Sequence, residues 1–174
     1  IAVLAAIIAP NAFKAIEKAK ITRAISDYKT IKKAVLALYA DTGYWAGKKN
    51  GNILIGNSSL LYNGWPTKND PSLVGWDGPY LDRSPDPHPW GGVYHFECEV
   101  DARRTPADIP NGEKEFAIDF EDYCYPSGPN SCPLPETAAK RIDETIDDGE
   151  QWWGDFRYTT GGDKLWIIVW DAWQ

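Results

Sequence analysis

Apolar residues fill the start of the chain without interruption, in the run IAVLAAIIA at residues 1–9. After Pro10 they recur at steps of three, four or seven positions as far as about Asp41, with lysines at many positions between them. This period predicts one amphipathic helix of roughly forty residues that packs one face on a core. Pro10 is expected to break or kink it, because proline donates no backbone hydrogen bond and clashes with the preceding turn. Thr42 and Gly43 are expected to end it. The apolar stripe consists of Ile21, Ile25, Tyr28, Ile31, Val35, Leu38 and Tyr39.

The middle of the chain has no clear period. Residues 43–92 are rich in glycine, asparagine, proline and tryptophan, which indicates a long loop with one brief helix near Ser58–Tyr62. Two segments that follow are rich in β-forming residues, and we expect strands at Val93–Cys98 and Glu115–Phe120.

The last third of the chain contains a second helix and a hairpin. The helical segment covers residues 133–148, where prolines stand at the start and Gly149 stops the helix. The hairpin joins Phe156–Thr159 to Lys164–Trp170 through the turn Gly161-Gly162.

Charge is distributed unevenly along the chain. Residues 1–50 carry nine Lys and Arg against three Asp and Glu, a balance of +6, whereas residues 51–174 carry nine against twenty-two, a balance of −13. A basic segment joined to an acidic one is typical of a chain that meets a partner of opposite charge, and that partner could be another copy of itself. The alternative is that the lysines only solvate one helix face. The basic residues expected to reach an acidic neighbour are Arg23, Lys29, Lys32 and Lys33.

Signs of catalysis are absent from the sequence. His95 and Glu97 form the H-x-E that begins a zinc deaminase signature, but the required P-C-x-x-C is missing. No phosphate-binding loop, dinucleotide fingerprint or nucleophile elbow is present. We therefore expect a protein that is not an enzyme and has no cofactor.

Calcium remains an alternative at Asp143, Asp147 and Asp148, although we prefer to interpret these residues as acids at a helix end.

Three cysteines allow one disulfide. Cys124 and Cys132 flank a short, turn-rich stretch that a disulfide closes readily, so we expect this pair to be bonded and Cys98 to be free. Pairings that involve Cys98 stay open. The sequon at Asn57 is a candidate glycosylation site.

Two stretches resemble the type IV pilins and the pseudopilins of type II secretion, the major pseudopilins most of all. The first comprises IAVLAAIIAPNAF, KAIEKAK and ISDYKTIKKAVLALYADTGYW, which are similar to the N-terminal helix of that family and to its helix end. The second is DGPYLDRSPDPHPWGGVYHFE, which resembles a family segment ending in Asp-Pro-Trp-Gly-x-x-Tyr. The matching residues are Asp86, Pro89, Trp90, Gly91 and Tyr94, with Pro87 and His88 inserted.

The chain departs from the family at both ends. It contains no methionine, and the family's methylated Phe and the Glu that follows it are missing. Alignment on Pro10 places about a dozen apolar residues before Ile1, which would complete the roughly 20 residues needed to span a membrane. The family's acidic calcium loop is replaced by Asp147-Asp148-Gly149 and a tryptophan-rich hairpin.

The resemblance implies an α+β, pilin-like fold with a long N-terminal helix on a small antiparallel sheet. Residues 1–24 would form the assembly stem and residues 25–174 the globular head. The implied function is that of a structural subunit of a helical type IV pilus-like filament for adhesion, motility or DNA uptake. One alternative is a major pseudopilin of a type II secretion system, and a second is a membrane-anchored monomeric binding module or enzyme.

The resemblance also implies partners and a location. The chain would polymerise with itself, reside in the inner membrane before assembly and engage the pilus or secretion machinery, and no specific nucleic acid is expected. The product would be an extracellular filament or a periplasm-spanning pseudopilus. The residues expected in the assembly core are Ile1, Val3, Leu4, Ile7, Ile8, Pro10 and Phe13.

Overall fold

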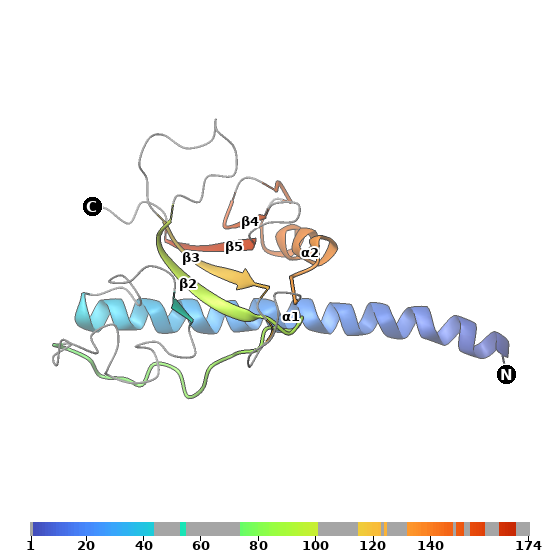
Figure 1. Cartoon of the computed structure of the whole chain (residues 1–174), viewed down its shortest axis with the longest axis horizontal. Coiled ribbons are helices and arrows are strands. Elements are labelled where there is room, and N and C mark those ends of the chain that lie inside the picture. The colour runs from blue at the N-terminus through green and yellow to red at the C-terminus, as the bar shows by residue number, and fades with distance from the viewer. Residues whose placement is uncertain are drawn as a thin grey trace.

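The computed structural model of the chain describes residues 2–43, 53–54, 74–100, 115–122, 124, 132–147, 149–151, 154–158 and 164–169. Within these segments the side chains of residues 2–9, 53–54, 95–100, 115–116 and 164–169 are not described. The architecture is α+β and pilin-like, with one long helix lying along a small antiparallel sheet (Figure 1).

Helix α1 covers Ala2–Thr42, a span of 41 residues. It continues through Pro10, so of the two outcomes expected at this residue the break is wrong, and the kink stays a prediction. The expected end is confirmed: Gly43 has a φ of 70°, and its N–H donates to the carbonyl of Tyr39 at 2.8 Å. A residue with positive φ closes the last turn in this way, and glycine adopts that conformation without steric cost.

Within the described residues the sheet has five antiparallel strands in the order β1-β2-β3-β5-β4. The predicted strands are confirmed and slightly longer than expected, with β2 at Val93–Val100 and β3 at Glu115–Glu121. The predicted hairpin forms from β4, Phe156–Tyr158, and β5, Lys164–Val169. The sequence pattern did not indicate strand β1, Ile53–Leu54, and the helix expected near Ser58–Tyr62 lies outside the described residues.

Helix α2 covers Glu136–Ile146, which is shorter than the predicted span of 133–148. Pro135 precedes its first turn with φ −61° and ψ 141°, and the Pro135 carbonyl accepts hydrogen bonds from the N–H groups of Ala138 and Ala139. Extended backbone at the cap explains why the helix starts after the prolines. The face of α2 that carries Ala138, Ala139 and Ile142 is buried.

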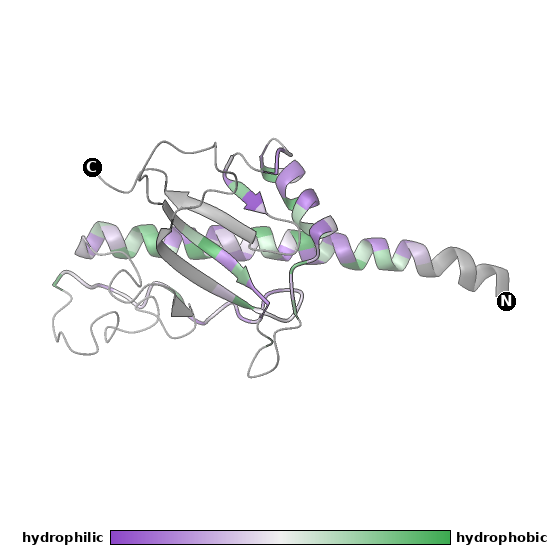
Figure 2. Cartoon of the chain, turned by 45° about the horizontal axis from the view of Figure 1, so that its top comes forward, coloured by the Kyte–Doolittle hydropathy of each residue, from purple (hydrophilic) through white to green (hydrophobic). Residues whose placement is uncertain are grey.

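The core lies between one face of α1, the sheet and α2, and the alternation of apolar and polar positions along α1 can be followed in Figure 2. Among the α1 side chains that the structure describes, the buried ones run from Ile21 to Leu38. Ile21 and Ala24 fall within residues 1–24, which were predicted as stem, yet both belong to the core of the head. The other core residues of α1 are Tyr28, Ile31, Ala34 and Val35, and those supplied by the rest of the chain include Tyr94, Ile118, Phe120, Leu134, Ile142 and Phe156.

Candidate assembly surface

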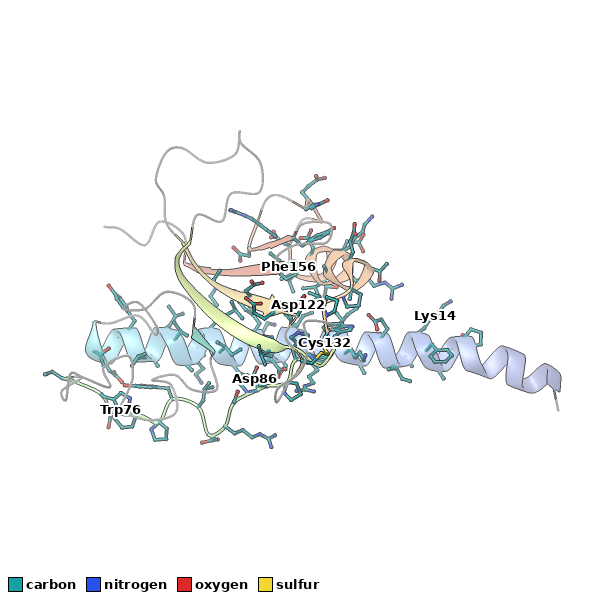
Figure 3. The ribbon with its side chains drawn as sticks, in the orientation of Figure 1. Lys14, Trp76, Asp86, Asp122, Cys132 and Phe156 are labelled. Atoms are coloured by element: carbon teal, nitrogen blue, oxygen red, sulfur yellow. A yellow bond between two sulfur atoms is a disulfide. The ribbon has the colours of Figure 1, made fainter. Side chains whose placement is uncertain are left out.

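The N-terminal half of α1 projects from the head (Figure 1). Phe13 is 71% exposed and Ile16 is 55% exposed, and Lys14 stands on the same projecting segment (Figure 3). Covering large apolar side chains lowers their free energy, so these residues favour contact with an apolar partner. Of the predicted assembly residues, Pro10 and Phe13 are exposed, Ile1 lies outside the described residues, and Val3, Leu4, Ile7 and Ile8 are placed in α1 by their backbone alone.

An open groove runs along α1 beside the core, and the buried core residue Ala34 is part of its lining. It has a volume of about 690 Å³, and its lining combines small or hydroxyl-bearing side chains with larger ones. Lys29 and Lys33 line it from α1, and Tyr80 lines it from the following segment. The remaining lining residues are Thr22, Ile25, Ser26, Thr30, Ala34 and Ala37.

Arg23 fastens α1 to the proline-rich segment of the head. Its Nη2 donates to the carbonyl oxygen of Pro85 at 3.1 Å and to that of Pro87 at 2.7 Å. Its Nε lies 3.4 Å from the Asp27 carboxylate, one helical turn further along. The contact between Arg23 and an acidic neighbouring copy stays a prediction, and within the chain the guanidinium is held by its own head.

Asp27 and Asp86 complete this attachment around Tyr94, at the start of β2. The Tyr94 hydroxyl donates to Asp27 Oδ2 at 3.0 Å, and the Tyr94 N–H donates to Asp86 Oδ1 at 2.8 Å. Ser84 Oγ donates to Asp86 Oδ2 at 2.7 Å. Burial raises the pKa of Asp27, opposed by its hydrogen bond from Tyr94 and by the charge of Arg23. Burial also raises the pKa of the Tyr94 phenol, which keeps it a neutral donor.

His88 is buried beside this network with 1% of its surface exposed. The Trp90 N–H donates to His88 Nδ1 at 3.2 Å, so Nε2 carries the proton that it donates to the Glu121 carbonyl at 3.0 Å. The ring packs among aromatic side chains, with centroids 5.8 Å from Tyr94 and 5.6 Å from Phe120. Burial lowers the pKa of His88 to about 4, and the nearby charge of Arg23 acts in the same direction.

A disulfide joins Cys124 to Cys132, the pair favoured by their short spacing. The Cys132 N–H donates to the Asp122 carbonyl at 2.9 Å, and the sulfur of Cys132 lies against Gly91. Figure 3 shows Asp86, Asp122 and Cys132 close to the place where α1 leaves the head. The disulfide therefore supports the proline-rich segment at the base of the stem. The side chain of Cys98 is not described.

The acids considered for calcium do not gather into a binding site in the part of the chain that the structure describes, where no group of three metal-ligating side chains occurs. Asp143 is buried on α2, whereas Asp147 Oδ2 accepts the N–H of Phe156 at 3.2 Å and lies against Gly154. The Asp147 carboxylate thus orders the turn before β4. Asp148 and the sequon at Asn57 lie outside the described residues.

Sequence reasoning missed His88 and the role of Arg23. The spacing of Arg23 and Asp27, four positions apart, indicates an ion pair on one helix face, but nothing local indicates which loop lies over that face. His88 stands within the resembling segment as an inserted residue, and its burial could be inferred only once the segment was known to pack on β3.

Comparison with known proteins gives one match. A family model described as "PilW, C-terminal" matches residues 15–106, more than half of the chain. No curated protein and no solved structure matches. Among the described residues, no helix has the length and apolar character needed to cross a membrane.

Proposed function

Because the chain belongs to the PilW C-terminal family, which is related to type IV pili, we propose that it is a structural subunit of a helical pilus-like filament. The observation that carries the proposal is the projecting half of α1, where Phe13 and Ile16 are exposed on a helix continuous with the core of the head. The subunit would join its neighbours through these helices, and the heads would form the outer surface. Adhesion, motility or DNA uptake would follow from display of that surface.

The physical argument concerns the projecting helix. An apolar stem loses less free energy in a bundle of stems, or in lipid, than in water. Identical subunits that join through two different surfaces form an open helical assembly unless the rotation closes into a ring. The head is firmly attached to α1 through Arg23, Asp27 and Tyr94, so a force on the stem is passed to the head. These features support a load-bearing filament subunit, and the proposal places its precursor in the inner membrane and its filament outside the cell.

The test places a charge in the stem. Ile8→Lys and Leu4→Asp are expected to abolish filaments in electron micrographs of expressing cells, because a charge at the centre of an apolar helix bundle costs about 2.5–3.5 kcal/mol by analogy with membrane insertion. The matched control is Thr137→Lys on the exposed face of α2, which should assemble normally. Normal filaments from Ile8→Lys cells would refute the proposal.

A second candidate is a major pseudopilin of a type II secretion system. It is favoured by the segment Asp86–Tyr94, which resembles that family and here forms the attachment between head and stem. Deletion of the gene separates the two: loss of exoprotein secretion with no loss of surface filaments would favour the pseudopilus. A membrane-anchored monomer would form neither structure, and the same micrographs test it.

A further inference from the structure

Three lysines stand on α1 between its apolar beginning and the head, and we call them the basic collar. Lys14 and Lys18 are exposed on the projecting segment, where Figure 3 shows Lys14 well away from the head. Lys20 stands where this segment meets the head, with its ammonium 5.9 Å from the centre of the Trp90 ring. Within the described part of the chain, none of the three forms an ion pair with a carboxylate. Their positive charge is therefore available to an anionic partner.

The collar lies close to the apolar run of residues 1–9. At 1.5 Å per residue, Lys14, Lys18 and Lys20 follow residue 9 by about 8, 14 and 17 Å along the helix. Side chains on a helix tilt toward its N-terminus, so each ammonium reaches back toward the apolar run. The lysines among residues 29–33 follow the same residue by about 30–36 Å, beside the head. The lysines of α1 thus form two groups at different distances from the apolar run.

Exposed apolar side chains accompany the collar on the projecting segment. Phe13 is 71% exposed and Ile16 is 55% exposed. The nine apolar residues before Pro10 make about 14 Å of helix, close to the thickness of one leaflet in a hydrocarbon core of about 30 Å. Apolar side chains and lysines within the same helical turns match the boundary between lipid and water, where the long lysine side chains extend to the headgroups.

We propose that the basic collar binds the anionic headgroups of a membrane leaflet and holds the subunit upright on that leaflet before assembly. Residues 1–9 lie in the hydrocarbon, and Phe13 and Ile16 lie at its boundary. The collar lies among the headgroup phosphates and just above them. The inference rests on the proposed function, because it concerns the membrane stage of the same subunit, and it adds the chemical class of lipid that the subunit recognises.

The distribution of charge supports the upright orientation. Residues 51–174 have a balance of −13, so an anionic surface repels the head. Glu17 is the single acidic residue among residues 1–26, so the collar stays net positive and is attracted to the same surface. The Debye length at 0.1 M salt is about 10 Å, which includes the collar but excludes the lysines among residues 29–33. Attraction at the collar and repulsion of the head together hold the head away from the lipid.

Vesicle binding tests the collar with the full chain. The purified chain is mixed with vesicles of phosphatidylcholine alone or with about 30% phosphatidylglycerol, in about 0.1 M salt, and the bound fraction is measured by flotation. The chain should bind the anionic vesicles at least about tenfold more tightly, because each lysine near such a surface contributes about fivefold and Glu17 offsets one of the three. The preference should be lost in about 1 M salt, where the Debye length is about 3 Å.

Charge variants show which residues carry this preference. Lys14→Gln, Lys18→Gln and Lys20→Gln together should abolish it, whereas Glu17→Gln should raise it about fivefold. Glutamine has nearly the helix propensity of lysine, so α1 should be preserved. The matched control replaces the three lysines among residues 29–33 by glutamine, which removes the same charge from the same helix, and it should bind as the wild type does.

A quenching measurement distinguishes an upright subunit from one that lies flat on the membrane. In a Cys98→Ser background, a fluorophore on Ala15→Cys or on Ala40→Cys reports on two exposed positions of α1 about 37 Å apart. Lipids that carry a quencher on the headgroup should cause a loss of fluorescence at position 15 and none at position 40.

Equal binding to both kinds of vesicle, loss of the preference in the control variant, or quenching at both positions would overturn the inference. If the collar variant binds anionic vesicles as the wild type does but loses its filaments, the collar contacts another copy instead, and the inference is wrong while the proposed function stands. If the collar binds anionic lipid but the wild-type chain forms no filaments under any condition, the proposed function alone fails.

Discussion

Stability between pH 7 and pH 4 should depend on the buried His88. The folded protein keeps this imidazole neutral down to a pKa of about 4, compared with an ordinary value of 6.5. The unfolded chain binds a proton through that interval and the folded chain does not, so acid favours the unfolded state. The stabilising contribution is complete above about pH 7 and is lost progressively as the pH falls from 6.5 toward 4.

The magnitude follows from the interval between the two pKa values. At 1.36 kcal/mol for each pH unit, it corresponds to about 3 kcal/mol, a large part of the 5–15 kcal/mol typical of a folded domain. Protonation of Nδ1 would also remove the acceptor used by the Trp90 N–H. Asp27 acts in the opposite sense, because its raised pKa makes the folded state the better proton acceptor. It offsets part of the loss at the acid end of the range.

The assay is urea unfolding of residues 11–174, which retain every α1 residue of the core, at pH 7, 6, 5 and 4.5. His88→Gln can still donate to the Glu121 carbonyl but does not titrate in this range, so its stability should be lower at pH 7 and nearly flat between pH 6.5 and 4.5. His95→Gln serves as the control, because it removes the other histidine of the chain. The reasoning would be refuted if the free energy of unfolding of His88→Gln still fell with pH in this range while that of His95→Gln did not.

Three further predictions concern the attachment of the stem. Replacing Cys124 and Cys132 by serine should lower the free energy of unfolding by about 2–3 kcal/mol in urea titrations, since the bond closes a short loop; no change in midpoint would contradict this. Gly92→Ala should destabilise by at least about 1–3 kcal/mol, because its added methyl would overlap the Glu121 carbonyl and the His88 ring; a thermal midpoint equal to that of the wild type would show that the segment yields. Tyr94→Phe should lower the free energy of unfolding by about 1–2 kcal/mol, because it removes the hydrogen-bond donor of the half-buried Asp27 carboxylate. Calorimetry can check whether this loss of stability is smaller below the pKa of Asp27.

Local pattern was sufficient for most of the secondary structure. The period of α1, the glycine at its end, the strands β2 and β3 and the closing hairpin all follow from spacing and turn residues within a few positions of one another. The disulfide between Cys124 and Cys132 was favoured for the same reason, since the two residues are only eight positions apart. The expected break at Pro10 did not occur, because a proline removes one hydrogen bond and does not by itself end a helix of 41 residues.

The sequence by itself determined a basic helix with an apolar beginning, an acidic later part and the elements of an α+β head. Only the tertiary structure decided that β5 lies between β3 and β4, that Arg23 is held by the carbonyls of Pro85 and Pro87, and that His88 is buried against β3. The reason is physical: helix and strand periods are set by neighbours along the chain, whereas these contacts join residues more than thirty positions apart. Those distant contacts also decided which basic residues of α1 are held within the chain. Arg23 is bound by the head, whereas Lys29 and Lys33 lie on the open groove.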